Sequence, residues 1–181
     1  MLHITVPKTE FFDENTSTFI DIKETNLCLE HSLASISKWE AKWHIPFLDD
    51  KKEKTAEQTL DYIKCMTLTQ NVNPFVYLAL TEQNMKEISA YIDDSQTATW
   101  FAEDKHKTGR NRQIITSEVI YSWMVAHQIP VEFQKWHINR LLTLIRVCNE
   151  NNNPKKMSKR DVYAQNRALN AQRKAARRSK G

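Results

Sequence analysis

One long apolar stretch, from Thr116 to Asn149, constrains the fold of this chain more than any other part of it. Apolar residues recur along it at helical spacing, and Pro130 interrupts that spacing directly after Ile129. We therefore predict two amphipathic helices that meet at Pro130 and whose inner faces close a core. The expected inner faces comprise Val119, Ile120, Trp123 and Met124 in the first helix, and Phe133, Trp136, Leu141, Leu144, Ile145 and Cys148 in the second.

A strongly basic segment follows this stretch. From Pro154 onward there are ten Lys or Arg residues against one acidic residue, Asp161, which gives this segment a charge of +9. The whole chain carries +4, so the residues before Pro154 together carry −5. The chain is therefore expected to be an acidic body with a basic tail, and the overall charge describes neither part.

Composition favours a mainly helical protein. The 181 residues include only two glycines and five prolines, too few for a β-sandwich or β-barrel with many tight turns. Alternating apolar residues in the first thirty positions indicate strands at 2–6, near Phe11 and Phe12, at 19–22, and near Leu27 and Leu29. We predict an α+β fold that is mainly α: a small antiparallel sheet over 1–31, a helical bundle body over 32–150, and an extended or marginally helical basic tail over 154–181.

Helix start signals divide the body. They are Ser32, the capping-box pair Thr55 and Gln58, the dipeptide Asn73-Pro74, and Thr81. The helix that begins at Ser32 is expected to end at Pro46, the one that begins at Thr55 near Thr67, and the one that begins at Thr81 at Asp93-Asp94.

No catalytic or metal-binding motif emerges from the sequence. Glu30, His31 and Ser32 contain the residue types of a catalytic triad, but adjacent side chains point in different directions, so capping and packing are the favoured roles. His127 and His137 lack carboxylates at a metal-ligand spacing. We expect a protein that is not an enzyme and holds no cofactor or metal.

Two further features argue against nucleotide chemistry and disulfides. Residues 105–112 read KHKTGRNR, which has the residues of a phosphate loop in the wrong order and no preceding strand, so a solvated loop is favoured. Trp100 and Phe101 are expected to anchor that loop on the core. The three cysteines, Cys28, Cys65 and Cys148, are far apart and are expected to be reduced, buried thiols.

Two sets of residues are candidates for binding. The first is apolar and could either fill the core or form a partner-binding patch: Trp39, Trp43, Phe47, Trp123, Met124 and Trp136. The second could bind a polyanion or dock on an acidic protein surface: Lys155, Lys156, Lys159, Arg160, Arg167, Arg173, Lys174, Arg177 and Arg178. Aromatic residues for base stacking are scarce in the tail, where Tyr163 stands alone.

Two stretches carry a resemblance to a known family. They are LCLEHSLASISKWEAKWHIPFL, residues 27–48, and ITSEVIYSWMVAHQIPVEFQKWHINRLLTLIRVCNENNNPKKMSK, residues 115–159, with SKWE, QKWH and NRLL as the most characteristic runs. In these the chain resembles the tail-assembly chaperones of long-tailed bacteriophages. The resemblance implies a helical, non-enzymatic protein of the host cytoplasm. It would bind the apolar helices of the tape-measure protein, recruit tail-tube protein, and leave before the virion is complete.

Two other functions remain open at this point. The basic tail could serve a nucleic-acid-binding phage accessory protein, or the chain could be a structural tail or head–tail component of the virion. No stretch reaches the roughly 18 uninterrupted apolar residues of a membrane span, so we expect a soluble protein without membrane association.

Overall fold

The computed structural model describes residues 1–13, 17–49, 53–99, 101, 114–152, 163, 166–170 and 173. The chain divides into two compact units, Met1–Arg146 and Val147–Gly181, and each is described by itself. The basic loop predicted at 105–112 and Trp100 lie outside the described residues.

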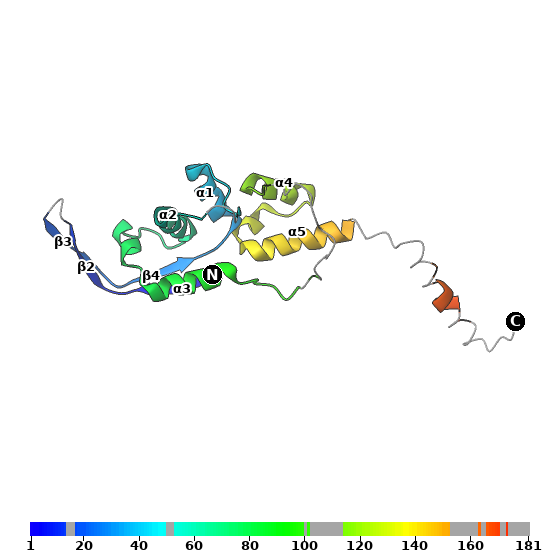
Figure 1. The fold of residues 1–181 in the computed structure, drawn as a ribbon, viewed down its shortest axis with the longest axis horizontal. Helices are drawn as coiled ribbons and strands as arrows, with labels where there is room; N and C mark the ends of the chain where they lie inside the picture. Colours follow the sequence, from blue (N-terminus) through cyan, green and yellow to red (C-terminus); the bar gives the residue numbers. More distant parts are fainter. Residues whose placement is uncertain are drawn as a thin grey trace. The chain divides into compact units, whose positions relative to one another are not determined.

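The predicted N-terminal antiparallel pairing is present, but as two two-stranded sheets instead of one small sheet. Strand β1 (Leu2–Val6) pairs with β4 (Thr25–Leu29), and β2 (Thr9–Asp13) pairs with β3 (Thr18–Ile22). The register is continuous, because Leu2 faces Leu29 at one end and Asp13 faces Thr18 at the other with no net shift. The four strands therefore form one long hairpin, interrupted near Pro7 and Lys23 (Figure 1).

The helices from α1 (Leu33–Trp43) to α3 (Glu82–Asp93) follow their predicted start signals. In chain order, the helices that the structure describes are α1, α2 (Ala56–Met66), the 3₁₀ helix η1 (Pro74–Ala79), α3, α4 (Ser117–Ala126), the 3₁₀ helix η2 (Val131–Lys135) and α5 (Ile138–Asn152). Ser32 caps α1, and the predicted capping box of Thr55 and Gln58 is present at α2. Thr81 caps α3 as predicted. Helix α1 ends three residues before Pro46, because His44 adopts a left-handed conformation with φ of 55°.

The second half of the apolar stretch differs from the prediction of one helix. After Pro130 the chain forms η2, becomes extended at Trp136, and resumes as α5 only at Ile138. The interruption coincides with tertiary backbone pairing: Ser32 and His137 form an antiparallel bridge, and the Ile138 N–H donates to the His31 carbonyl at 2.8 Å. Backbone groups at this point are thus bonded to the start of α1 instead of to a helical turn.

The core lies where the hairpin base meets the helices. Its largest fully buried side chains include Trp39, Ile22, Leu27, Leu29, Leu33, Ile36, Ile63, Met66, Ile120, Ile138 and Leu141. The outer edge of β4 is paired with the residues that follow α2, because Leu29 and Thr67 form an antiparallel bridge and the Leu68 N–H donates to the Cys28 carbonyl at 2.8 Å. Of the predicted inner faces, Ile120, Met124, Leu141 and Ile145 are buried, and Val119, Trp123, Phe133, Trp136 and Leu144 are half-buried. None of the helices in the described ranges is long and apolar enough to cross a membrane.

Candidate partner-binding surface

Three of the six candidate partner-binding residues belong to the core. Trp39, Phe47 and Met124 expose 1%, 8% and 2% of their surface. The Phe47 ring lies between Trp39 and α2, with centroids 5.2 Å from the Trp39 ring and 4.0 Å from the Tyr62 ring of α2. The Trp39 indole also donates to the Gln58 carbonyl at 2.9 Å. These three residues pack the interior and are not offered to a partner in this structure.

Trp43 is half-buried and is held in place by a carboxylate. Its indole N–H donates to Asp61 Oδ2 at 2.9 Å, while the Lys42 ammonium binds Asp61 Oδ1. Burial disfavours ionisation of Asp61, but the hydrogen bonds from Lys42 and Trp43 outweigh it, and the pKa of this carboxyl lies below its ordinary value. The exposed part of Trp43 is therefore a rigidly positioned aromatic edge between α1 and α2.

The corner between α4 and η2 carries the other two tryptophans. The α4–η2 corner consists of Trp123, Val125, Val131, Phe133 and Trp136, of which Val125 and Val131 are 78% and 58% exposed. Trp136 stacks on Phe133 with centroids 3.9 Å apart, and the guanidinium of Arg140 lies 4.2 Å from the Trp136 ring. Stacking thus fixes the orientation of the Trp136 ring, and the corner exposes apolar side chains on both α4 and η2.

A second apolar surface was not predicted as a binding site. It is a pocket of about 400 Å³ between α2, η1 and α3, lined by Lys54, Ala56, Thr59, Leu60, Tyr77, Leu78, Leu80 and Met85. Leu78 stands on it with 59% of its surface exposed. We call it the leucine pocket. Leu78 is exposed although its neighbours Tyr77 and Ala79 in η1 are buried. The sequence alone does not show which face of this short helix points inward, because that depends on the elements packed around it.

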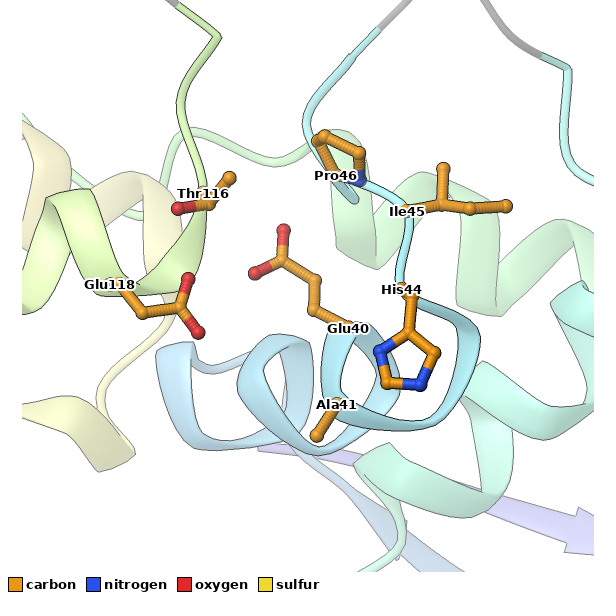
Figure 2. Close-up of a pocket in the computed structure, with 7 residues that line it drawn as sticks. All are labelled: Glu40, Ala41, His44, Ile45, Pro46, Thr116 and Glu118. Atoms are coloured by element: carbon orange, nitrogen blue, oxygen red, sulfur yellow. The ribbon is translucent and has the colours of Figure 1, made fainter.

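Another pocket surrounds a buried carboxylate. This pocket of about 280 Å³ lies between the end of α1 and the start of α4, and is lined by Glu40, Ala41, His44, Ile45, Pro46, Thr116 and Glu118. Figure 2 shows the Glu40 carboxylate directed into the gap between Thr116 and Pro46.

Glu40 joins two segments that are far apart in sequence. Its Oε1 accepts from the Phe47 N–H and its Oε2 from the Ser117 N–H, both at 2.7 Å. Ser117 is the first residue of α4, and the N-cap Thr116 makes no side-chain capping bond, so Glu40 supplies the anion that this helix terminus favours. Both carboxylate oxygens are thus engaged with backbone. The sequence gives one indication of this role: Glu40 is a charged residue four positions after Ile36, and therefore lies on the apolar stripe of α1.

The Glu30-His31-Ser32 segment does not converge on one point. Glu30 accepts from the Tyr91 hydroxyl at 2.8 Å, whereas Ser32 accepts from the Ser35 N–H as the cap of α1. His31 Nδ1 instead contacts the Tyr62 hydroxyl. Each side chain has its own partner on a different element, as expected from adjacent residues.

Two histidines pack together inside the protein. The rings of His31 and His137 lie 5.0 Å apart and edge to face, and His137 Nε2 is 3.0 Å from the Tyr91 carbonyl. Burial, with smaller contributions from His137 and Lys54, lowers the pKa of His31 to about 3. His31 is therefore neutral at physiological pH and serves as a hydrogen-bonding core residue.

The remaining predicted sites are only partly described. In the part of the chain that the structure describes, no group of three or more His, Cys, Asp or Glu could hold a metal ion. The three cysteines are free thiols as predicted, but they are half-buried instead of buried. Phe101 lies 3.9 Å from the Arg146 guanidinium.

Of the tail candidates, Arg167 and Arg173 are exposed and helical. The other tail candidates fall outside the described residues: Lys155, Lys156, Lys159, Arg160, Lys174, Arg177 and Arg178.

Comparisons with known proteins returned no relative: the chain matches no family model, no curated protein and no solved structure.

Proposed function

We propose that this protein is a phage tail-assembly chaperone that binds apolar helices of the tape-measure protein and assists assembly of the tail tube. The observation that carries the proposal is the leucine pocket. A chaperone for amphipathic helices needs an exposed apolar recess lined by side chains that adapt to different helix faces, and Leu, Tyr and Met provide one. Leu60, Leu80 and Met85 are half-buried in this pocket and Leu78 is exposed on it.

The α4–η2 corner offers a second apolar contact for a long client helix. Half-buried tryptophans are favoured at protein interfaces because they bury much area at little conformational cost. Trp123 and Trp136 have this character, and Trp43 presents a fixed edge between α1 and α2. The resemblance to tail-assembly chaperones supplies the identity of the client, and these surfaces supply a physical means of binding it.

The test is co-expression with an affinity-tagged fragment of the tape-measure protein, followed by capture on the tag. Leu78→Asp places a charge on the pocket and is expected to reduce capture at least tenfold. Val125→Asp introduces the same charge at a position that is 78% exposed on the corner, and is expected to have a smaller effect. Equal capture of the wild type and of both variants would remove the support that the pocket gives to this function.

A nucleic-acid-binding role is the second candidate, and the exposed arginines of the tail favour it. Arg167 and Arg173 lie on exposed helical residues within a segment of charge +9. Phosphate contacts of this kind give an affinity that falls steeply with salt. Titration of labelled duplex DNA at two salt concentrations, with the full chain and with a chain ending at Asn153, distinguishes this role: only the full chain should bind.

A further inference from the structure

The outer part of the hairpin has two chemically distinct faces. In the β2–β3 pair, Phe12 lies opposite Phe19 and Glu10 lies opposite Asp21. Opposed residues share a face and successive residues alternate, so these four side chains stand together on one face. The other face carries Ile22, which is 1% exposed, so that face is the one packed on the body.

The phenylalanine pair is exposed to solvent. Phe12 and Phe19 are 54% and 72% exposed, and their ring centroids lie 5.1 Å apart. Figure 1 shows β2 and β3 reaching away from the helices of the first unit. Strand β3 approaches the body at η1, and the sheet has only two strands. Nothing within the described part of this unit covers the pair, and two adjacent exposed aromatic rings are a recurrent feature of binding sites.

Charge defines what this face can bind. Residues 9–22 contain Glu10, Asp13, Glu14 and Asp21 and no Lys, Arg or His. Glu10 and Asp21 are directly opposed, and like charges in that position destabilise a strand pair. Lys8 compensates weakly, because its ammonium is 3.8 Å from Asp21 and both side chains are at least half exposed. A cation brought by a partner would relieve this repulsion.

We propose that this face binds a cationic amphipathic helix of another protein. An apolar side chain of that helix lies on Phe12 and Phe19, and a Lys or Arg about one turn away lies over Glu10 and Asp21. The spacing fits, because the two rows are two residues apart along a strand, about 6.8 Å, and one helical turn advances about 5.4 Å. A second copy of the hairpin is a poor occupant, since it would set the two carboxylates of this face, Glu10 and Asp21, against the same two carboxylates of the other copy. The proposal does not depend on the function proposed above.

The experiment uses the full chain and a fluorescein-labelled helical peptide of Ala, Leu and Lys with one apolar face. A second peptide replaces each Lys by Glu. Fluorescence anisotropy measures binding of each at low and moderate salt. We expect the Lys peptide to bind at least tenfold more tightly than the Glu peptide, with an affinity that falls as salt rises.

Two variants and two controls locate the binding. Phe12→Ser with Phe19→Ser, and Glu10→Gln with Asp21→Asn, should each weaken binding of the Lys peptide at least tenfold, and the second should also remove most of the salt dependence. The control pairs are Leu68→Ser with Ile114→Ser, and Glu82→Gln with Glu87→Gln, which alter exposed apolar and acidic residues outside every surface proposed to bind a helix and should retain wild-type affinity. Circular dichroism verifies that each variant is folded.

Three outcomes would overturn the proposal. They are equal binding of the two peptides, wild-type affinity in both hairpin variants, and equal losses in the control pairs, which would indicate attraction to the acidic body as a whole. Sedimentation of the chain without peptide tests whether a second copy of the chain occupies this face. A dimer that is lost in the Phe12, Phe19 variant would assign this face to a second copy instead.

Discussion

Replacing Glu40 by Gln should destabilise the protein far more than its position beside a solvent-accessible pocket suggests. The carboxylate accepts two backbone hydrogen bonds at 2.7 Å, one from Phe47 and one from Ser117, and is only 7% exposed. The Gln amide has the same shape but a single acceptor oxygen. One of the two backbone N–H groups would then face an NH₂ group and lose its partner.

The magnitude follows from the groups involved. A hydrogen bond to a charged acceptor contributes about 1.5–3 kcal/mol, and a buried donor left unsatisfied costs about 1–3 kcal/mol. The lost interaction of the charge with the α4 terminus adds about 0.5–1 kcal/mol. These contributions overlap, and we expect Glu40→Gln to lower the free energy of unfolding by roughly 2–4 kcal/mol. For a chain of this size that corresponds to a melting temperature lower by about 5–15 °C.

Urea unfolding followed by tryptophan fluorescence measures this loss. The matched control is Glu118→Gln, the same substitution in the same pocket and in the first turn of α4, but at an exposed position. It should cost no more than about 0.5–1 kcal/mol, the usual contribution of an exposed charge at a helix terminus. A loss below 0.5 kcal/mol for Glu40→Gln, or equal losses in the two variants, would refute the assignment of Glu40 as the anchor of α4.

Three further predictions concern the core and the caps. The pKa of His31 is about 3 in the folded state against 6.5 in the unfolded chain, so the unfolded state binds the proton first as the pH falls. The free energy of unfolding should therefore decrease between pH 6.5 and pH 3, by up to about 5 kcal/mol. Urea titrations at several pH values should show a weaker pH dependence for His31→Gln than for the wild type, and an unchanged dependence would contradict this role. Thr55→Ala should lower the free energy of unfolding by about 1 kcal/mol, because it removes the capping bond that Thr55 accepts from the Gln58 N–H. Thr116→Ala should lower it much less, because Thr116 makes no such bond. Equal losses of stability in the same unfolding assay would argue against the observed caps. Trp39→Phe keeps an aromatic ring but removes the donor to the Gln58 carbonyl and leaves a small void, and calorimetry should show a loss of roughly 2–3 kcal/mol, which a loss under 0.5 kcal/mol would disprove.

Local signals located most of the elements correctly. The strands at 2–6 and 19–22, the cap at Ser32, the capping box at Thr55 and the start at Thr81 all appear in the structure. These signals act within a few residues: alternation sets the face of a strand, and a cap bonds its own helix. They can therefore be read from the sequence without knowing the neighbours.

The candidate site was harder to predict because exposure depends on distant contacts. Trp39 and Trp43 lie one helical turn apart on α1, yet the first is in the core and the second is half-buried. Their separation into two roles depends on where α2 passes. The sequence identifies the exposed Phe12 and Phe19 only as strand residues, because it does not show that the outer hairpin extends beyond the covering helices.

What the sequence by itself determined is thus the mainly helical fold with a small N-terminal sheet, and the starts of α1, α2 and α3. Only the tertiary structure decided that the apolar stretch after Pro130 breaks again at Trp136 and His137, where backbone pairing with Ser32 replaces a helical turn. It also decided that Glu40 caps a helix whose first residue lies 77 positions away. Both depend on bonds between residues distant in sequence, and neither leaves a periodic pattern in the residues that make it.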